Sequence, residues 1–228
     1  MTTRMKHLIA AFALCSAVAV PALASPVTYE VLNRGTGIIG VPADGGPVTT
    51  IPFSFSAYGF AREASGDYVV AAVSSLMRVK PTGESSVIAT APTGSQLLSV
   101  AIDVAGNYIV ADNDMHRILR ISADGASITP VATYPVVLDN EAEDVHIRIN
   151  AAGDYVLAED NENLHLFTIT PGGVVTSVPL TGHIPQLAGG MTFDPAGNYI
   201  VTAFFEGSVL SITPEGASSA CHFVQWAV

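Results

Sequence analysis

The sequence has few basic residues and almost no cysteine. It carries 9 Lys and Arg against 20 Asp and Glu, and only 2 cysteines in 228 residues. A chain this acidic lacks the basic face that nucleic acids and anionic lipids need. So few cysteines exclude a disulfide-rich scaffold and a cysteine-rich zinc site. The fold must therefore be stabilised by an apolar core, for which 49% hydrophobic residues supply ample material.

Common catalytic motifs and long apolar segments are also missing. The sequence has no HExxH zinc motif, no G-x-S-x-G elbow and no P-loop. No apolar run reaches the ~20 residues that a membrane-spanning helix needs. The repeated part described below holds no apolar stretch of period 3.6 that is long enough for a helix. Short strands are therefore the expected structural element.

The first 24 residues have the pattern of a secretory signal peptide. Arg4 and Lys6 supply a positive start, Leu8–Val20 is a 13-residue apolar stretch, and Ala22-Leu23-Ala24 is an A-x-A cleavage site. The stretch is too short to span a bilayer as a helix. We therefore expect cleavage after Ala24 and a secreted or periplasmic protein of residues 25–228, with no membrane span left.

Cleavage makes the chain more acidic and leaves it one cysteine. Loss of Arg4 and Lys6 leaves 7 basic and 20 acidic residues, a formal charge of −13. Cys15 leaves with the signal peptide, and Cys221 alone cannot form an internal disulfide. The remaining charge favours solubility and the attraction of cations.

A unit with a similar turn sequence occurs four times along the chain. The turns are in ASGDYVVA, VAGNYIVA, AAGDYVLA and PAGNYIVT, and their glycines are Gly66, Gly106, Gly153 and Gly197, spaced by 40, 47 and 44 residues. Glycine accepts positive φ, and the following Asn or Asp can hydrogen-bond to nearby backbone, so this is a turn signal. Repeats of roughly 40–50 residues made of short strands are typical of a β-propeller.

Each copy is predicted to contain four short strands. In the copy around Gly106, strand-type segments are expected at 97–104, 108–111, 117–122 and 128–133. Arg117 to Ser122 alternates polar and apolar residues with the period of two that a half-buried strand shows. A Tyr follows the turn in every copy, at Tyr68, Tyr108, Tyr155 and Tyr199. We interpret it as a ring that packs between neighbouring blades, the alternative being a repeated ligand-binding aromatic.

The fold prediction is an all-β propeller of four-stranded blades, with about five blades in this chain and the first incomplete. The repeats run over about 27–52, 54–92, 96–135, 144–182 and 187–217. After Gly216 the sequence ASSACHFVQWAV departs from the apolar outer-strand pattern. It is either a closing strand or the end of a truncated six- or seven-bladed propeller. An incomplete ring would expose strand edges through which molecules can associate.

The repeat resembles the NHL-repeat propellers and, more loosely, the virginiamycin B lyase and gluconolactonase groups. The segment that carries the resemblance is ADNDMHRILRI, Ala111–Ile121, which is similar to the "VAD…NHRI" core of NHL repeats. Met115 stands where that pattern has Asn, and the other copies depart further. The resemblance covers about residues 38–216. It implies a propeller, and it transfers no catalytic residue to this chain.

Acidic residues gather in loops that an up-and-down blade opens on one face. They lie in the loop after the second strand of two neighbouring blades, or in the link before one of them, and the candidates for a metal site are Asp112, Asp114, Asp144, Glu159 and Asp160. Ca²⁺ and Mg²⁺ bind to such oxygen ligands. The prediction is a Ca²⁺ or Mg²⁺ site, with a merely solvated acidic rim as the alternative. No other cofactor is predicted.

His116 and His165 occupy nearly corresponding places in adjacent blades, where the loop meets the third strand. Histidine titrates near neutral pH and is a candidate for acid–base catalysis. The alternative is an incidental polar residue at a strand end. The two histidines are the catalytic candidates of the sequence.

Three functions remain open at this point. The first is a binding scaffold whose loop face contacts a protein, a small molecule or a glycan, with a divalent cation bound there. The second is a metal-dependent lyase or lactonase, as the looser resemblance implies. The third is a non-functional fragment of a longer propeller. Acid, Asn and His side chains that converge at the propeller axis would favour the enzyme, and acids spread over the rim would favour the scaffold.

Overall fold

The computed structural model describes residues 28–135, 144–161, 163–182, 188–203 and 208–221, which form nineteen strands and no helix. Sheet 1 contains β1 (Thr28–Asn33), β2 (Gly37–Pro42) and β3 (Thr49–Pro52). Sheet 2 contains β4 (Gly59–Arg62), β5 (Tyr68–Ala71), β6 (Ser75–Val79) and β7 (Ser85–Thr90). Sheet 3 contains β8 (Leu97–Ile102), β9 (Tyr108–Asp112), β10 (Arg117–Ile121) and β11 (Ile128–Thr133).

The last two sheets repeat this order. Sheet 4 contains β12 (Asp144–Ile149), β13 (Tyr155–Asn161), β14 (Asn163–Ile169) and β15 (Val175–Ser177). Sheet 5 contains β16 (Ala188–Phe193), β17 (Tyr199–Ala203), β18 (Ser208–Ile212) and β19 (Ser218–Cys221). Every strand pair is antiparallel. The predicted five-bladed propeller with an incomplete first blade is confirmed.

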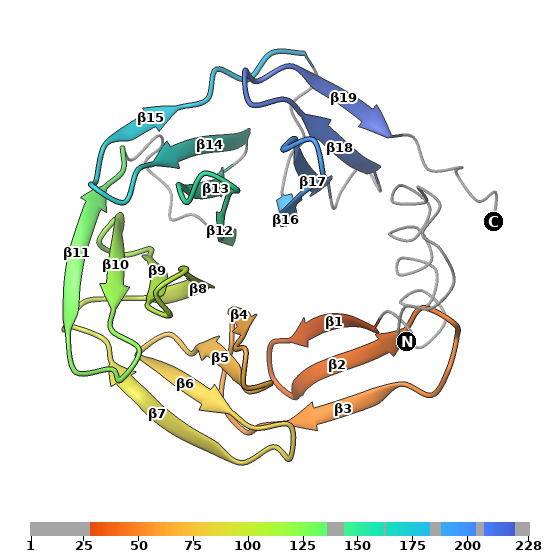
Figure 1. Cartoon of the computed structure of the whole chain (residues 1–228), viewed down its shortest axis with the longest axis vertical. Coiled ribbons are helices and arrows are strands. Elements are labelled where there is room, and N and C mark those ends of the chain that lie inside the picture. The colour runs from red at the N-terminus through yellow and green to blue at the C-terminus, as the bar shows by residue number, and fades with distance from the viewer. Residues whose placement is uncertain (1–27, 136–143, 162, 183–187, 204–207, 222–228) are drawn as a thin grey trace.

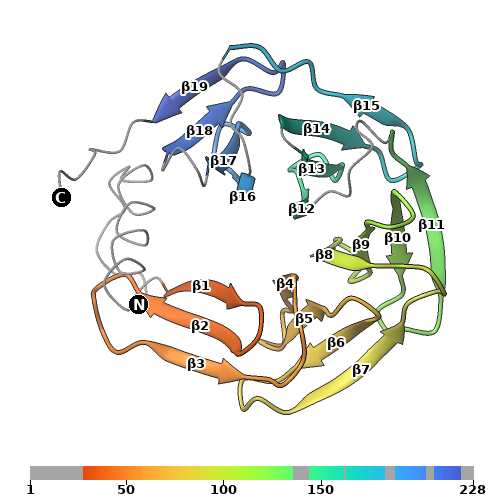
Figure 2. The same cartoon turned by 180° about the vertical axis from the view of Figure 1, so that it is seen from behind.

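The five sheets stand as blades around a common centre (Figure 1). β4, β8, β12 and β16 are the inner strands, and each contacts the next one around the ring. Among the described strands, the ring has an opening between sheet 5 and sheet 1, which both views show (Figures 1 and 2). The described residues thus do not form a sealed ring of six or more blades, as the sequence predicted. They also contain no helix that could span a membrane.

The repeated glycines occupy tight turns between the first and second strands. Gly66, Gly106, Gly153 and Gly197 have φ between 83° and 94°. In sheet 3 the turn is closed by Asp103, whose Oδ1 accepts hydrogen bonds from the backbone N–H groups of Ala105 (2.9 Å) and Asn107 (2.8 Å). The left-handed region is open to glycine and costly for other residues. This confirms the turn interpretation.

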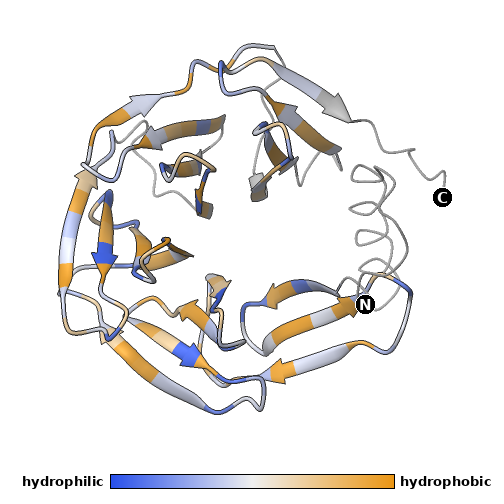
Figure 3. Ribbon diagram, in the orientation of Figure 1, coloured by the Kyte–Doolittle hydropathy of each residue, from blue (hydrophilic) through white to orange (hydrophobic). Residues whose placement is uncertain are grey.

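The core lies between the sheets rather than within any one of them. Tyr68, Tyr108, Tyr155 and Tyr199 are at most 5% exposed, and each packs in the cluster that joins its sheet to the preceding one. The hydroxyl of Tyr68 donates to Glu30 Oε1 of sheet 1 (2.6 Å). Apolar residues accordingly dominate the strands (Figure 3). The tyrosines are packing residues, as expected, and not a repeated ligand site.

The residue after each tyrosine faces the following sheet. Val69, Ile109 and Val156 are fully buried there. Ile200, at the same place in sheet 5, is only half-buried, because no described sheet follows it. The face of sheet 5 at the opening is therefore less covered than the corresponding faces between sheets.

The fourth strand of the last copy forms although its sequence is polar. β19 (Ser218–Cys221) pairs with β18, and its start is held to the link after β15. Thr181 donates its N–H to Gly216 O (2.8 Å) and accepts a hydrogen bond from the N–H of Ser218 (3.1 Å). The segment after Gly216 thus begins as the outer strand of blade 5. The predicted signal peptide, residues 1–24, lies outside the described residues, so export stays a prediction.

Candidate functional site

One end of the propeller, which we call the loop face, carries the hairpin loops between second and third strands and the links between sheets. It includes loops 72–74 and 113–116 and links 53–58 and 91–96. Links and loops are hydrogen-bonded to one another: the Asn113 N–H donates to Gln96 O (2.8 Å), and the Tyr134 N–H donates to His116 O (3.0 Å). The predicted site residues lie at this end of the blades, but most of them belong to strand ends and not to loops or links as predicted: Asp112, Asp144, Glu159 and Asp160.

Asp112 is the last residue of β9, and its hydrogen bonds hold the loops of sheet 3 together. Its carboxylate is fully buried and accepts hydrogen bonds from Ser95 Oγ (2.8 Å), the Gln96 N–H (2.9 Å) and Arg117 Nε (2.8 Å). Arg117 Nη2 also donates to Ser95 Oγ (3.1 Å). One carboxylate and one guanidinium thus tie the β7–β8 link to the β9–β10 hairpin.

The other predicted metal ligands are distributed unevenly. Asp114 is exposed in the β9–β10 loop, and Glu159 is buried near the end of β13. Asp144 and Asp160 are paired opposite one another across β12 and β13, but their side chains lie outside what the structure describes. Among the described residues, no three His, Cys, Asp or Glu side chains lie together as a metal-binding group would. The cation site therefore stays a prediction.

Glu159 points into the interface between sheets 3 and 4. It follows Tyr155 and Leu157 at every second position of β13, and both of these pack against sheet 3. The side chain is 3% exposed, and its Oε2 has no hydrogen-bond partner among the described residues. Val145 and His165 stand directly opposite it on the neighbouring strands. Burial raises the pKa of Glu159 to about 7, because the charged form loses its hydration.

Tyr134 lies in the same interface, within electrostatic reach of Glu159, and was not singled out from the sequence. It follows β11 directly, is 3% exposed, and its hydroxyl has no hydrogen-bond partner among the described residues. Its ring lies edge-on to His116, with centroids 5.8 Å apart, and 6.2 Å from the ring of Phe167 on β14. Burial, followed by the charges of Glu159 and Asp112, raises the pKa of the Tyr134 hydroxyl.

A comparison of the links could have identified Tyr134. Phe53 and Val178 follow the outer strands of sheets 1 and 4 at the same place, and both are buried and apolar. The first residue of a link is thus a core position. Tyr134 is the member of this set with a hydroxyl, and that departure from an apolar pattern was the available signal.

His116, which contacts Tyr134, lies at the end of the β9–β10 loop. Its backbone is in the left-handed region, with φ of 43°, and its N–H donates to Asn113 O (3.0 Å). Its Nδ1 is buried without a hydrogen-bond partner among the described residues. His165 is half-buried, and burial lowers its pKa. The two predicted histidines thus both face the interface of sheets 3 and 4, His116 through its contact with Tyr134 and His165 opposite Glu159.

Glu159, Tyr134 and His116 together form what we call the Glu159 cluster. Each contributes a buried polar atom without a partner among the described residues: Oε2, the hydroxyl and Nδ1. Leaving one such atom unsatisfied costs about 1–3 kcal/mol. Native proteins rarely keep several in one place unless water, an ion or a ligand satisfies them. The chemistry that the cluster offers is acceptance of hydrogen bonds from a positively charged or donor-rich ligand.

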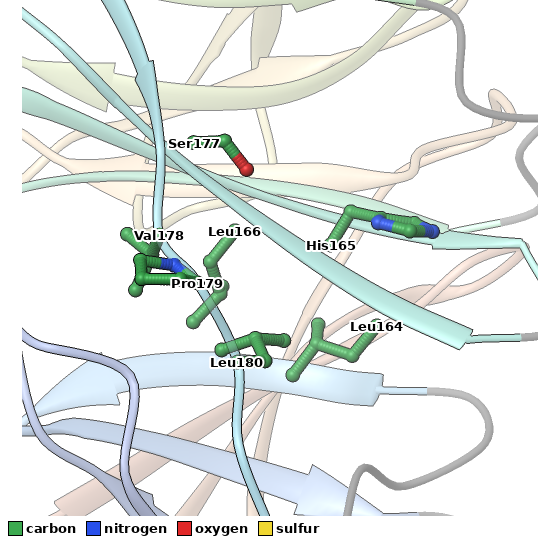
Figure 4. A pocket seen from close by; sticks show the side chains of 7 residues that line it. All are labelled: Leu164, His165, Leu166, Ser177, Val178, Pro179 and Leu180. Atoms are coloured by element: carbon green, nitrogen blue, oxygen red, sulfur yellow. The ribbon is translucent and has the colours of Figure 1, made fainter.

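A separate depression lies at the outer side of sheet 4, with a volume of about 370 Å³ (Figure 4). It forms because β15 is short and pairs only with Phe167–Ile169 of β14. Figure 4 shows Leu164, Leu166 and Leu180 gathered on one side of β14 and His165 on the other. Its described lining is mostly apolar and contains no Asp, Glu, Lys or Arg, which distinguishes it from the Glu159 cluster.

Comparison with known proteins supports the fold. Virginiamycin B lyase from Staphylococcus aureus in complex with quinupristin is 16% identical, with a TM-score of 0.59 over 89% of this chain and 61% of that one. The nidogen/laminin complex contains a chain that is 16% identical, with a TM-score of 0.69 over 87% of this chain and 80% of that one. A gluconolactonase from Xanthomonas campestris is 12% identical, with a TM-score of 0.63 over 85% and 71%.

These similarities establish a propeller and not an activity, because identity is below 25% and one fold hosts many functions. The chain spans 61–69% of the length of the virginiamycin B and streptogramin B lyases that it matches. No protein-family model and no curated protein matches the sequence.

Proposed function

We propose that this chain is an exported binding module that takes up a positively charged ligand on its loop face. The observation that supports this most directly is the Glu159 cluster, in which one oxygen of a buried carboxylate, Oε2, has no hydrogen-bond partner among the described residues. Buried charges in proteins are normally paired or coordinate an ion. The formal charge of −13 after cleavage attracts cations to the molecule as a whole.

The support beneath this site suits a binding module. The bonds of Asp112 to Ser95, Gln96 and Arg117 hold the loops of sheet 3 in one arrangement. A face that is ordered before the ligand arrives loses less conformational entropy on binding. Asp114, Asp144 and Asp160 belong to the same face and would raise the local concentration of cations.

The test is a thermal melt of residues 25–228 in CaCl₂, MgCl₂ or methylammonium chloride against NaCl of equal ionic strength. A ligand that binds only the folded protein raises its stability by RT ln(1 + [L]/Kd), about 2.7 kcal/mol at a hundredfold excess over Kd. NaCl supplies the screening control, since the Debye length is about 10 Å at 0.1 M. Equal melting temperatures in all four salts would reject cation binding at this face.

A second function, a metal-dependent lyase or lactonase, is favoured by one specific feature. Glu159 and His165 stand opposite one another across β13 and β14. The pKa of Glu159, at about 7, is near the value that suits a general acid or base at neutral pH. Incubation with quinupristin and with gluconolactone, with and without Mg²⁺, tests it by mass spectrometry of the products. Turnover that is lost in Glu159→Gln would support this function over a purely binding role.

A further inference from the structure

We propose that the Glu159 cluster recognises a primary ammonium group carried by a small ligand. This inference rests on the proposed function, since it specifies which cation the loop face takes up. The geometry behind it is the convergence of three elements on the interface between sheets 3 and 4: the end of β13, the residue after β11 and the β9–β10 loop. Each element supplies one residue of the cluster, and each of these residues has a buried polar atom without a partner among the described residues.

The hydrogen-bond acceptors of the Glu159 cluster match the donors of an ammonium group. Glu159 Oε2 and the Tyr134 oxygen are acceptors, and Nδ1 of neutral His116 accepts when the ring proton is on Nε2. An ammonium group presents three N–H donors and no acceptor. One –NH₃⁺ therefore has as many donors as the cluster has unsatisfied atoms.

A divalent metal ion fits this set of atoms less well. Ca²⁺ takes six to eight oxygen ligands, and Mg²⁺ takes six in a strict octahedron. The cluster offers one carboxylate, one phenol and one imidazole. The nearby Asp112 already accepts three hydrogen bonds, one of them from Arg117. The rings of His116, Tyr134 and Phe167, in contact one after the other, favour an organic cation instead.

The electrostatics of the site also favour a cation. Glu159 and Asp112 both act on the Tyr134 hydroxyl as negative charges and raise its pKa. Both described guanidiniums of β10 are already bound: Arg117 is paired with Asp112, and Nη2 of Arg120 donates to the Tyr155 hydroxyl and to Pro171 O. A bound ammonium would stabilise the charged form of Glu159 and lower its pKa. The described interface also contains His116, His165 and Tyr155.

The first experiment compares methylammonium chloride with tetramethylammonium chloride, CaCl₂ and NaCl at equal ionic strength in thermal melts of residues 25–228. Tetramethylammonium has the same charge and no N–H donor. We expect a stabilising shift with methylammonium that exceeds the shift with each of the other three salts. A shift of equal size with tetramethylammonium would overturn the hydrogen-bonding assignment.

Two variants and one control assign the effect to the cluster. Glu159→Gln is expected to weaken methylammonium binding at least tenfold, and Tyr134→Phe several-fold. Asp114→Asn removes one negative charge from an exposed position of the same loop face, and should leave the affinity within about twofold. Equal losses in Asp114→Asn and Glu159→Gln would show general attraction to an acidic surface and overturn the proposal.

The second experiment follows the carboxyl carbon of Glu159 by NMR. Methylammonium should lower the pKa of Glu159 from about 7, a readout that a purely structural role would not move. If a divalent cation gives a Glu159-dependent shift and methylammonium gives none, the ammonium proposal is wrong while the binding function stands. If neither gives a shift, both fail.

Discussion

Asp112 and Glu159 occupy the same place in neighbouring blades and differ in what surrounds them. Each is the fourth residue after the blade's tyrosine, at or near the end of the second strand, and each is buried. Asp112 is paired in register with Arg117, and Glu159 with His165. The arginine donates to Asp112, whereas Glu159 Oε2 finds no partner among the described residues. The same position of the repeat thus holds the loops together in sheet 3 and provides a candidate ligand-binding carboxylate in sheet 4.

The largest effect on stability is expected when Asp112 loses Arg117, its ion-pair partner. Arg117→Ala would leave a buried carboxylate with two neutral donors, and should destabilise the fold by about 3–5 kcal/mol. His165→Ala, at the corresponding place in sheet 4, should cost less than about 1 kcal/mol, because no hydrogen bond joins His165 to Glu159 in the described structure. Urea unfolding at pH 7 measures both. Similar losses in the two variants would remove the distinction between the sites.

The next prediction concerns pH. Since the folded protein holds the pKa of Glu159 at about 7, above its ordinary value of 4.5, this residue stabilises the fold fully below pH 4.5. That contribution is lost as pH rises through 7, and on the order of 1–3 kcal/mol is at stake. His165, whose pKa is lowered by burial, changes stability in the opposite sense. The measurement is therefore the difference between wild type and Glu159→Gln in urea at pH 4.5 and 8, and a difference independent of pH would contradict the assignment.

Gly106→Val tests whether the sites around Asp112 and Glu159 depend on a distant turn of sheet 3. Gly106 has φ of 83°, and an added Cβ would meet nothing closer than Ala123 Cβ at 4.0 Å. The cost is therefore backbone strain of about 1–2 kcal/mol. The turn lies at the end of β9 opposite to Asp112, so the pKa of Glu159 should not change. An unaltered melting temperature would show that the turn tolerates a β-branched residue.

The smallest expected effect on stability comes from His165→Arg, which gives Glu159 the residue type that faces Asp112. A guanidinium opposite Glu159 should lower its pKa by 1–3 units, as opposite charges do at short range. The free energy of unfolding at pH 7 should change by about 1 kcal/mol or less, because the cost of burying the guanidinium offsets the gain from the new ion pair. Binding of methylammonium should be lost. A pKa for Glu159 that stays near 7 in the NMR titration would show that register alone does not decide the pairing.

The fold was predictable because its signals are local and repeated. Gly106 and its three counterparts mark turns through the backbone angle that they permit, and the tyrosine after each turn marks the buried face. The placement of Asp112 and Glu159 at the same end of neighbouring blades followed from the order of strands in a blade. These inferences need only short-range sequence and the regularity of the repeat.

The chemistry of the site was less predictable, because it depends on contacts between segments far apart in the sequence. Asp112 was grouped with the metal ligands, and nothing local indicated that Ser95 and Gln96 of the preceding link would donate to it. Glu159 became distinctive through burial against sheet 3. Tyr134 lies in a link outside the repeated motif. Its position in the same interface as Glu159 follows from how two blades pack, which no single repeat encodes.

The partial burial of Ile200 bears on the order in which the sheets unfold. In each inner interface the corresponding residue is fully buried, so stability is shared between nearest neighbours, as in a one-dimensional array of repeats. Sheets 2, 3 and 4 have described neighbours on both sides, whereas sheets 1 and 5 each have one. Amide hydrogen exchange should therefore slow from the opening inwards, with the slowest amides in sheet 3. The Glu159 cluster, between sheets 3 and 4, lies within the part of the array that opens last.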